Sequence, residues 1–376
     1  MKIVFTGGGT GGHFYPIIAV AEKINEIIEE RKLINVEMFF FSDQAYDEKA
    51  LFKENVEFVK INSGKWRRYF SLRNFTDSLK IAKGMFSALW QLYSIYPDIV
   101  FSKGGYASLP TVWAARILRI PIFIHESDSR PGRVSLWSAR FAKRIAVSYE
   151  SAIEHFKIED KGKIAVTGNP IRALIQLPLD KGAREFLNLS DDHPVIFITG
   201  GSQGAMAIND VVLDILPQLL ERYNVIHQVG KENMEDVKLR SQVVVEKNQD
   251  RYKLFDFLNE SAMRMVAGVS RLAISRAGSF IFELAIWGTP SIIIPIPEVV
   301  SHDQSSNAFA YARTGAAVVI EQENLLSSVL LAEINHLMDN STLLSEMSAA
   351  AKQFARPGAA RKIGDELVNI ALTHEK

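Results

Sequence analysis

The stretch FTGGGTGGH stands at residues 5–13 of the chain, and the similar stretch FITGGSQGA stands at residues 197–205. Each follows a short apolar run and precedes a segment in which apolar residues recur with helical spacing. Glycine lets the backbone turn tightly and approach a ligand without side-chain clashes. A turn of this kind at the start of a helix directs free N–H groups and the positive end of the helix dipole at an anion. The repetition indicates two tandem units, each opening with a strand, a glycine turn and a helix.

The rest of the chain alternates short β-branched or aromatic runs with longer segments of helical period. Residues 16–31, for example, predict a helix with a proline at its start and Ile17, Val20 and Ile24 on one face. Nearly continuous apolar strands between helices indicate a buried parallel sheet covered on both faces. The expected fold class is therefore α/β, with two Rossmann-like domains facing each other across a cleft. The expected strands are residues 2–5, 36–41, 56–61, 98–101, 122–125 and 145–147, then 195–199, 225–228, 253–255, 272–275, 291–295 and 316–320.

Glycine and proline mark the domain boundary. The segment GNPIRALIQLP at residues 168–178 predicts the linker. We expect an N-terminal domain at residues 1–170, a C-terminal domain at residues 171–345 and C-terminal helices at residues 346–376. The sequence does not place the last helix, residues 359–372, for which a return to the N-terminal domain is one option.

Length and composition narrow the class of protein. The chain has 376 residues, and a single hydrophobic core stops growing at roughly 250–300 residues, which favours two domains. The formal net charge is zero, so a general nucleic-acid binder is not expected. The absence of cysteine excludes disulfides and thiolate chemistry and fits a reducing compartment. The first residues predict a strand rather than a signal peptide, and no apolar run approaches the roughly 20 residues that span a bilayer. We therefore expect a cytoplasmic protein.

The first glycine turn also matches a dinucleotide-binding fingerprint, with glycines at positions 7, 9 and 12. That fingerprint requires an acidic residue about 20 residues further on, where it holds a ribose. Asp43 is the only candidate and comes late, so an NAD-dependent oxidoreductase ranks last among the enzymes considered. A purely structural role in tight strand–helix packing remains the alternative for both turns.

A series of polar and glycine-rich motifs runs along most of the chain. The motifs are GGGTGGHFYP (7–16), KGGYASLP (103–110), HESDSRPG (125–132), GNPIR (168–172), GGSQGA (200–205), SRAGS (275–279), FELAIWGTPSIIIPIP (282–297) and HDQSSNA (302–308). In this order they resemble the MurG family of glycosyltransferases, family 28, over roughly residues 1–322. The resemblance implies the GT-B fold, in which the active site lies in the cleft between two Rossmann-like halves.

The resemblance implies an inverting transfer of N-acetylglucosamine from UDP-N-acetylglucosamine to the muramyl 4-hydroxyl of lipid I, which gives lipid II for peptidoglycan synthesis. Such a reaction needs a base for the acceptor hydroxyl and stabilisation of the departing diphosphate. His13 is similar to the family's proposed base, and a positive helix end favours a neutral imidazole. Glu126 and Asp128 complete the expected catalytic set. Capping of the helix or orientation of the acceptor is the alternative role for His13.

The resemblance also assigns residues to the sugar nucleotide. Arg172 resembles the family arginine near the phosphates, and a linker salt bridge is its alternative. Glu283 resembles the carboxylate that accepts from both ribose hydroxyls, and it needs a partner because its helix is otherwise apolar. Met263 resembles a residue near uracil, with a core position as its alternative. The expected donor-binding residues are Thr10, Gly11, Gly12, Arg172, Ser202, Gln203, Gly204, Met263, Ser279, Glu283, Asp303 and Gln304. The expected loops for the acceptor or its diphosphate carry Gly104, Gly105 and Tyr106.

The chain departs from the family at residues 125–128, where HESD replaces the common HEQN. The carboxylate of Asp128 accepts hydrogen bonds but does not donate the one that an asparagine would. The pairs His125–Glu126 and His302–Asp303 lack zinc spacing, so neither a protein-bound metal nor another cofactor is expected. A Mg²⁺ ion that assisted the reaction would be carried by UDP.

Cations and aromatic rings interleave in residues 64–93. Together they suit the headgroup region of an anionic membrane. The predicted location is the cytoplasmic face of the plasma membrane, with peripheral attachment. The predicted membrane patch comprises Trp66, Arg67, Arg68, Tyr69, Phe70 and Phe75. The later part of the segment is expected to cover the sheet, with core positions for Leu79, Ile81, Phe86 and Leu89.

The expected partners are UDP-N-acetylglucosamine, lipid I, an anionic membrane surface and other proteins of cell-wall synthesis, with no nucleic acid. Other functions share the expected architecture. A GT-B enzyme with another acceptor is one, and a UDP-sugar 2-epimerase is another, although an epimerase needs no acceptor and no membrane patch. A non-catalytic nucleotide-binding scaffold would not require His13, Arg172, Glu283 and Gln304 together.

Overall fold

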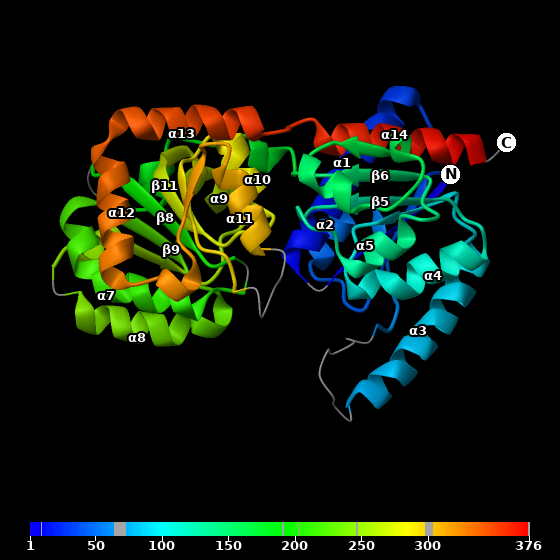
Figure 1. The fold of residues 1–376 in the computed structure, drawn as a ribbon, viewed down its shortest axis with the longest axis horizontal. Coiled ribbons are helices and arrows are strands. Elements are labelled where there is room, and N and C mark those ends of the chain that lie inside the picture. The colour runs from blue at the N-terminus through cyan, green and yellow to red at the C-terminus, as the bar shows by residue number, and fades with distance from the viewer. Residues whose placement is uncertain are drawn as a thin grey trace. The chain divides into compact units, whose positions relative to one another are not determined.

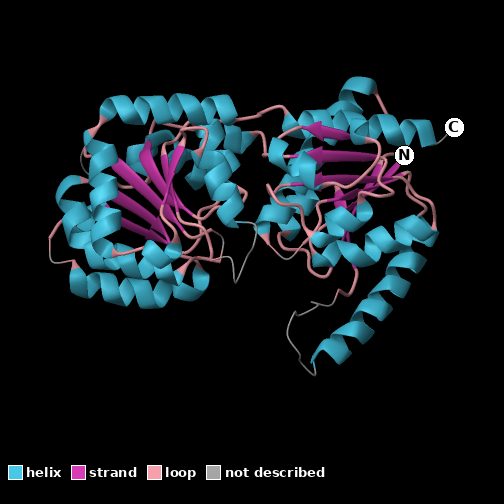
Figure 2. Ribbon diagram, in the orientation of Figure 1, coloured by secondary structure: helices cyan, strands magenta, loops and turns pink. Residues whose placement is uncertain are grey.

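The computed structural model describes residues 1–8, 10–63, 73–189, 192–201, 203–245, 247–297 and 304–374, without the side chains of residues 73–81 and 374. The chain forms two compact units. Unit 1 comprises Met1–Arg172 and Arg356–Lys376, and unit 2 comprises Ala173–Ala355. Each unit has one parallel sheet with helices on both faces (Figure 1; Figure 2).

Unit 1 contains a seven-stranded sheet in the order β3-β2-β1-β4-β5-β6-β7. The chain builds outward from β1 to β3 and then crosses back to place β4 on the other side of β1. The carboxyl ends of β1 and β4 therefore form a topological switch point, where open parallel sheets usually bind ligands. Its strands are β1 (Lys2–Thr6), β2 (Glu37–Ser42), β3 (Val56–Lys60), β4 (Ile99–Ser102), β5 (Ile122–Glu126), β6 (Arg144–Val147) and β7 (Ile164–Val166). Its helices are α1 (Gly11–Arg31), α2 (Glu48–Lys53), α3 (Arg73–Ile95), α4 (Leu109–Ile117), α5 (Arg133–Ser138) and α14 (Ala359–His374).

Strand β1 separates two apolar cores in unit 1. Ile3 and Phe5 pack with α1 and α14, whereas Val4 packs on the opposite face with α3 and α4. This follows from the alternation of side chains along a strand. Because both faces are buried, the three central residues of β1, Ile3, Val4 and Phe5, are all apolar. Each fully buried aliphatic or aromatic side chain stabilises the fold by about 1.5–3 kcal/mol.

Helix α14, which the sequence left unplaced, packs against α1 in unit 1. Ile363 and Leu367 join the core that also contains Ile24 of α1. Arg31 of α1 and Asp365 of α14 form an ion pair at 2.7 Å. Surface pairs of this kind contribute little, so the apolar contact carries most of the stabilisation.

Unit 2 contains a six-stranded sheet in the order β10-β9-β8-β11-β12-β13. Its switch point lies between β8 and β11, so each glycine turn follows the central strand of its own sheet. The strands are β8 (Val195–Thr199), β9 (Asn224–Gln228), β10 (Tyr252–Phe255), β11 (Ser270–Ser275), β12 (Ser291–Ile293) and β13 (Ala317–Val319). The helices are α6 (Ala183–Phe186), α7 (Met206–Arg222), α8 (Met234–Val244), α9 (Glu260–Val269), α10 (Phe280–Trp287), α11 (Gln304–Ala312), α12 (Ser327–Asp339) and α13 (Ser341–Phe354).

Two α/β units with parallel sheets are confirmed, and two details of the expectation are corrected. Helix α1 begins at Gly11, so Pro16 lies inside the helix rather than at its start. The expected start was wrong because a helix can continue through a proline at the loss of one backbone hydrogen bond, here the one to the carbonyl of Gly12. Strand β7 was not expected, because its three residues carry too little pattern to identify.

Helix α3 corrects a third detail. Phe86, expected in the core, is 75% exposed, whereas Leu89 packs against the apolar core beneath the helix. The two residues are three positions apart, about 60° around the helix, so the edge of the covered face falls between them, and the sequence did not show where that edge lies. Within the described part of the chain, no helix combines the length and the apolar character that crossing a membrane requires.

The close approach of α14 to α1 leads to a stability prediction. A Cβ at Gly364 would lie 3.2 Å from Cδ1 of Ile27, whereas one at Gly358 would meet nothing within 4 Å. Gly364→Leu is therefore expected to lower the free energy of unfolding by roughly 1–3 kcal/mol through overpacking. Gly358→Leu serves as the control and should change it by less than about 0.5 kcal/mol. Urea unfolding followed by circular dichroism measures both, and equal effects would contradict the packing argument.

Candidate active site

The carboxyl end of the unit 1 sheet gathers several of the expected site residues. The turn after β1 runs against the end of β4 and has no room for side chains. A Cβ at Gly7 would lie 3.0 Å from Cβ of Lys103, and a Cβ at Gly8 would lie 2.5 Å from the hydroxyl of Ser42. Close packing of the backbone therefore requires glycine at both positions.

His13 is the third residue of α1, after Gly11 and Gly12. Its Nδ1 lies 3.1 Å from the hydroxyl of Thr10, the residue that precedes the helix. Its Nε2 would lie 3.6 Å from a Cβ at Gly105, in the turn after β4. One ring nitrogen is thus engaged by Thr10, and the other faces a turn that has no side chain to cover it.

The environment of His13 disfavours its protonated form. Burial, followed by the charge of Lys103, lowers the pKa of His13 to about 4, and the carboxylate of Asp128 opposes the shift. The imidazole is therefore neutral at physiological pH. The sequence predicted a neutral imidazole from the helix end alone, but burial and a lysine are the main causes.

Glu126 ends strand β5 and is buried. Its carboxylate accepts hydrogen bonds from the backbone N–H groups of Asp128 at 3.1 Å and Gly132 at 3.0 Å, and so shapes the loop that follows β5. Burial, together with repulsion from Asp128, raises the pKa of Glu126 to about 7. A buried carboxyl group at the end of a strand, with a pKa near neutrality, is typical of functional sites.

The turn after β4 carries the expected acceptor loop. Gly104 and Gly105 have φ values of 80° and 78°, a left-handed conformation that favours glycine. The hydroxyl of Tyr106 donates to the carboxylate of Asp43 at 3.3 Å, and the hydroxyl of Ser63 donates to the same carboxylate at 2.9 Å. Asp43, the late candidate for a ribose contact, therefore braces this loop from the end of β2.

Arg172 is the last residue of unit 1 before the chain enters unit 2. Its guanidinium lies 4.2 Å from the ring centroid of Tyr15, which is on α1 two residues after His13. A cation–π contact of this kind contributes about 0.5–2 kcal/mol. It places Arg172 beside the start of α1, where Thr10 and the first helical residues also lie.

Unit 2 carries the second glycine turn, after β8. Gly201 and Gly204 have φ values of 88° and 75°, and a Cβ at Gly204 would collide with the carbonyl oxygen of Val229. Gln203 is exposed beside them. Helix α7 starts at Met206, so its positive end follows the turn directly.

Gln228, which the sequence reasoning did not select, holds this turn in place. Its side chain is buried at the end of β9. The amide nitrogen donates to the hydroxyl of Thr199 at 3.2 Å and to the carbonyl of Gly201 at 3.4 Å, and the amide oxygen accepts from the N–H of Leu258 at 3.0 Å. One side chain thus connects the ends of β8 and β10.

The remaining expected donor residues of unit 2 lie around the turn between β11 and α10. Ser279 precedes α10, and Glu283 is the fourth residue of that helix and partly buried. Gln304 opens α11, accepts from the N–H of Ile296 at 3.2 Å, and places its amide nitrogen 3.9 Å from the position of a Cβ at Gly278. Since β11 pairs with β8, the turn before α10 and the glycine turn follow adjacent strands of the sheet.

Met263 lies on α9, a helix that contacts α10. It packs against an apolar cluster that includes Leu187 and Phe197. Ser202, Asp303 and the patch of Trp66, Arg67, Arg68, Tyr69 and Phe70 lie outside the described residues, as does the side chain of Phe75.

Two family models match this chain, one in each half. The N-terminal domain model of glycosyltransferase family 28 matches residues 3–147, and the C-terminal domain model matches residues 195–363. The UDP-N-acetylglucosamine–N-acetylmuramyl-(pentapeptide) pyrophosphoryl-undecaprenol N-acetylglucosamine transferase of Clostridium perfringens (strain ATCC 13124) is 36% identical over 342 residues, 90% of each protein. The chain belongs to glycosyltransferase family 28.

Solved structures agree with membership of family 28. The structure of MurG from Acinetobacter baumannii has a TM-score of 0.71 and 26% identity, and the match covers 98% of this chain and 99% of that one. The UDP-GlcNAc 2-epimerase of Neisseria meningitidis, solved with UDP-GlcNAc bound, has a TM-score of 0.69 at 16% identity, over 98% of this chain and 100% of that one. The second likeness shows the fold alone. The GT-B fold expected from the motifs is confirmed.

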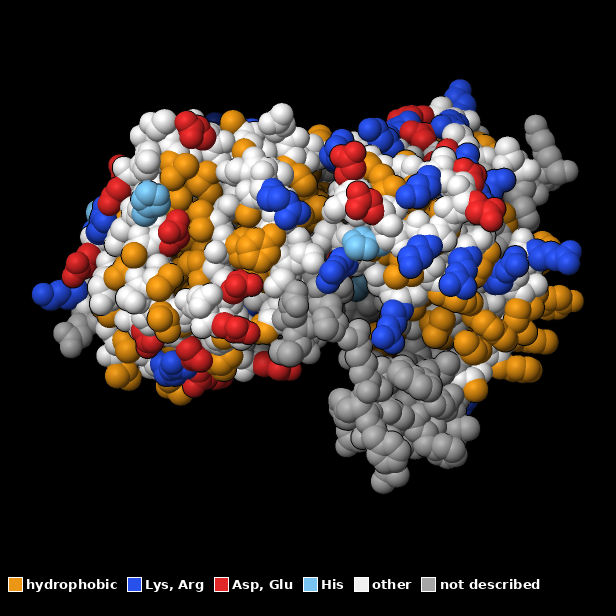
Figure 3. All heavy atoms as spheres, in the orientation of Figure 1, with side chains coloured by type: hydrophobic (Ala, Val, Ile, Leu, Met, Phe, Trp, Pro, Cys, Tyr) orange, Lys and Arg blue, Asp and Glu red, His pale blue; other side chains and the backbone are white. Residues whose placement is uncertain are grey.

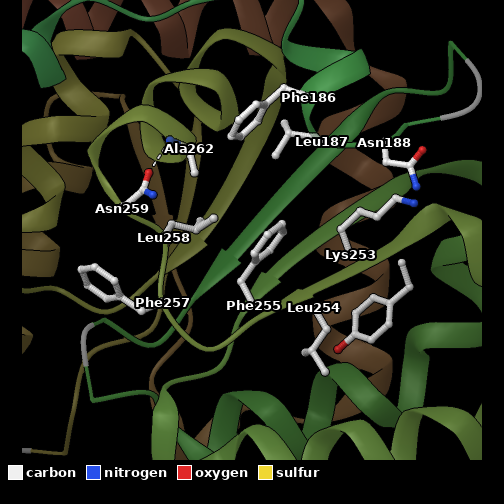
Figure 4. Close-up of a pocket in the computed structure, with 11 residues that line it drawn as sticks. Phe186, Leu187, Asn188, Lys253, Leu254, Phe255, Phe257, Leu258, Asn259 and Ala262 are labelled. Carbon is white, nitrogen blue, oxygen red and sulfur yellow. Dashed lines mark hydrogen bonds between the residues drawn. The ribbon is translucent and has the colours of Figure 1, made fainter.

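A cavity of about 480 Å³ opens at the edge of the unit 2 sheet of this family 28 chain. Figure 4 shows Phe186, Leu187, Phe255 and Leu258 around it, with Lys253 and Asn188 together at one side. The expected donor residues do not line it. Its apolar lining continues the cluster against which Met263 packs.

The two residues that the sequence reasoning missed, Lys103 and Gln228, share one signal. Each is a polar residue at the carboxyl end of a buried strand, with a glycine one or two positions further on. That position places a side chain at the ligand-binding edge of a parallel sheet. The sequence did not single them out, because Lys103 is one residue of the motif KGGYASLP and Gln228 belongs to no motif.

Gln228 provides a test of how the second glycine turn is supported. Gln228→Leu is expected to lower the free energy of unfolding by roughly 1–3 kcal/mol, because the buried N–H of Leu258 loses its acceptor. The control is Gln249→Leu, which removes a side-chain hydrogen bond to the carbonyl of Val245 from an exposed residue and should have a smaller effect. Chemical unfolding measures both variants. An unchanged stability for Gln228→Leu would show that the turn does not depend on this side chain.

Proposed function

We propose that this family 28 chain transfers N-acetylglucosamine from UDP-N-acetylglucosamine to the muramyl 4-hydroxyl of lipid I and forms lipid II with inversion. The observation that carries the proposal is the similarity to transferases of this name over nearly the whole chain, 33% over 383 residues in Treponema denticola and 36% over 342 residues in Clostridium perfringens. An enzyme that uses another acceptor would share the binding of the sugar nucleotide but not the reaction with lipid I.

His13 is proposed as the base. With the Nδ1 proton donated to Thr10, the lone pair of Nε2 faces the turn at Gly105 and accepts the proton of the sugar hydroxyl. A low pKa keeps the imidazole free to act. The carboxylate of Asp128, which raises the pKa of His13, stabilises the imidazolium that forms, and Glu126 shapes the loop that carries Asp128.

The donor is proposed to bind unit 2. The glycine turn with Ser202, Gln203 and Gly204 is proposed to hold the diphosphate, because it directly precedes the positive end of α7. Glu283 would accept from the ribose hydroxyls, and Gln304 with Asp303 would contact the sugar. Arg172, Thr10 and the first residues of α1, in unit 1, are the other proposed donor-binding residues, and the guanidinium of Arg172 is suited to stabilise the charge of departing UDP.

We propose that neither a protein-bound metal nor another cofactor takes part. Within the described residues, no three or more His, Asp or Glu side chains form a group that could hold a metal ion. A divalent ion that assisted departure of UDP would be bound by the diphosphate itself.

The surface that meets the membrane is proposed to include α3. Phe86, Trp90 and Tyr93 recur at helical spacing and are 75%, 67% and 65% exposed. Exposed aromatic residues in a row mark an interaction surface and suit the interfacial region of a bilayer. A peripheral attachment at this surface fits an acceptor whose polyprenyl chain stays in the bilayer.

Basic residues lie next to this aromatic face. Helix α4 packs against α3. A pocket of about 640 Å³ near the end of α4 is lined by Arg116, Arg119, Lys143, Arg144 and Lys163. Figure 3 shows a row of basic side chains beside a cluster of hydrophobic ones on unit 1. Each basic residue near an anionic surface contributes about 1 kcal/mol to membrane binding, so this arrangement favours binding to anionic lipid. The other proposed partners are proteins of cell-wall synthesis, and nucleic acid is not among them.

The transfer reaction tests the function directly. Purified protein with radiolabelled UDP-N-acetylglucosamine is expected to form a labelled lipid disaccharide only when a short-chain lipid I analogue is added, with release of UDP. Binding of the donor without product on lipid I would reject the acceptor. Label that appears as the 2-epimer without any acceptor would indicate an epimerase instead.

His13→Ala is expected to lower kcat by roughly 10²- to 10⁴-fold, because the acceptor hydroxyl loses its base. The control is His155→Ala, a histidine at the end of a short helical turn in the same unit, which should leave kcat within twofold. Initial rates at saturating substrates decide between them. A variant that loses affinity for lipid I but keeps kcat would assign His13 to binding rather than to proton transfer.

The triple variant Phe86→Ser, Trp90→Ser and Tyr93→Ser tests the membrane surface. We expect partitioning onto phosphatidylglycerol vesicles to weaken by at least roughly tenfold, since apolar area is removed from the interface. Phe52→Ser on α2, where the phenylalanine is 85% exposed, is the matched control and should partition normally. Vesicle sedimentation gives the bound fraction, and a soluble lipid I analogue shows whether turnover is kept. Normal partitioning of the triple variant would move the membrane surface elsewhere.

A further inference from the structure

Lys103 is a buried cation that the proposed reaction does not yet use. It follows β4 directly and is only 1% exposed. Its backbone N–H donates to the carbonyl of Thr6, the last residue of β1, at 2.8 Å. Within the described residues, its ammonium is buried and has no hydrogen-bond partner. A buried ammonium with no direct partner is costly and requires compensation from its surroundings.

The compensation comes from two carboxylates. Burial lowers the pKa of Lys103 to about 8, and Glu126 and Asp128 oppose that shift. The lysine is therefore charged at neutral pH because of these neighbours. The same charge acts on the imidazole of His13 in the opposite direction and disfavours its protonation.

The topology places the lysine between these groups. Strand β4 pairs with β1 on one side and β5 on the other. His13 follows β1 through the glycine turn, and Glu126 ends β5. Glycine at position 7 is required partly because Cβ of Lys103 occupies the adjacent space, so the lysine is packed against the turn that leads to His13.

We propose that Lys103 is a positioning residue for the transfer reaction, whose buried ammonium, set between His13 and the carboxylates of Glu126 and Asp128, determines which of them carries a proton when the acceptor binds. The proposal rests on the proposed function. With the ammonium present, the pKa values of His13 and Glu126 are lower than they would be without it, so the imidazole is neutral and a larger fraction of Glu126 is ionised. Without it, the pKa values of both groups would rise, and at neutral pH the proton that the cation keeps off the Glu126 carboxyl would be held there.

The other groups around His13 do not replace this cation. Thr10 is neutral and binds Nδ1 from the start of α1. Asp128, from the loop after β5, favours the protonated imidazole. Tyr106, from the turn after β4, is engaged by Asp43, and its pKa is raised by burial and by that carboxylate, so it stays neutral. Lys103 is thus the group on the described elements whose charge opposes protonation of His13.

Two readouts on Lys103→Met test the proposal. In the first, histidine ring signals of ¹³C-labelled protein are followed against pH by NMR, with His13→Gln identifying the resonance. The pKa of His13 is expected to rise by about one unit in Lys103→Met, because a nearby like charge is removed. Lys103→Arg keeps the charge and should leave the titration near that of the unchanged protein. Lys238→Met, at an exposed position of unit 2, is the matched control.

The second readout is the pH dependence of kcat/KM for the lipid I analogue. Loss of the cation raises the pKa of both His13 and Glu126, so the acidic limb should move up by about one pH unit whichever group governs it. If Glu126 governs the limb, the rate of Lys103→Met relative to the unchanged protein should be roughly fivefold lower at pH 6 than at pH 8, and if His13 governs it, the loss should appear only below about pH 5. Thermal unfolding and the far-UV circular dichroism spectrum of the variant, compared with those of the unchanged protein, verify that unit 1 is folded.

A folded Lys103→Met with an unchanged His13 titration and an unchanged acidic limb would overturn the proposal. A uniform loss of rate at every pH, without movement of the titration, would do the same, because it indicates a packing role only. If the unchanged protein forms no lipid disaccharide at any pH, the proposed function fails. The NMR titration then still decides whether Lys103 controls the proton on His13.

Discussion

Parallel pairing of β4 with β1 and β5 is the constraint on which the site in unit 1 depends. It brings three strand ends to one edge of the sheet, so the chain leaving each strand must turn within a few residues and very close to its neighbours. Glycine at positions 7 and 8 follows from this crowding, because a Cβ would meet Lys103 or Ser42. The same crowding buries Lys103 and Glu126 side by side with His13 and gives each of them a shifted pKa.

In unit 2 the side chain that holds the glycine turn is neutral. The turn is held by the buried amide of Gln228 rather than by charges. Gln304, the first residue of α11, lies near the turn before α10. A neutral cradle of N–H groups and amides suits a ligand that brings its own negative charge. A charged cluster suits proton transfer, since it sets where the proton resides. The two units therefore divide the proposed chemistry between a base and an anion site.

The sequence predicted much of the fold because both sheets are buried on both faces. Such strands are apolar throughout and easy to locate, and the glycine turns after them repeat in order. Strand β7 was not predicted because its three residues carry too little pattern. The predicted start of α1 was wrong because Pro16 is tolerated inside the helix. Phe86 was assigned to the core because spacing shows that a helix has faces without showing which face is covered.

For the site, the sequence by itself determined the residue types and their order: the two glycine turns, His13, the HESD segment, Glu283 and Gln304. These signals are local, since each depends on neighbours within a few positions. Only the tertiary structure decided that Lys103 follows the strand that pairs with both β1 and β5, that Asp43 accepts a hydrogen bond from Tyr106, and that α14 packs against α1. The order of strands in a sheet and the direction of a helix face are set by packing between segments far apart in the chain, which local patterns do not encode.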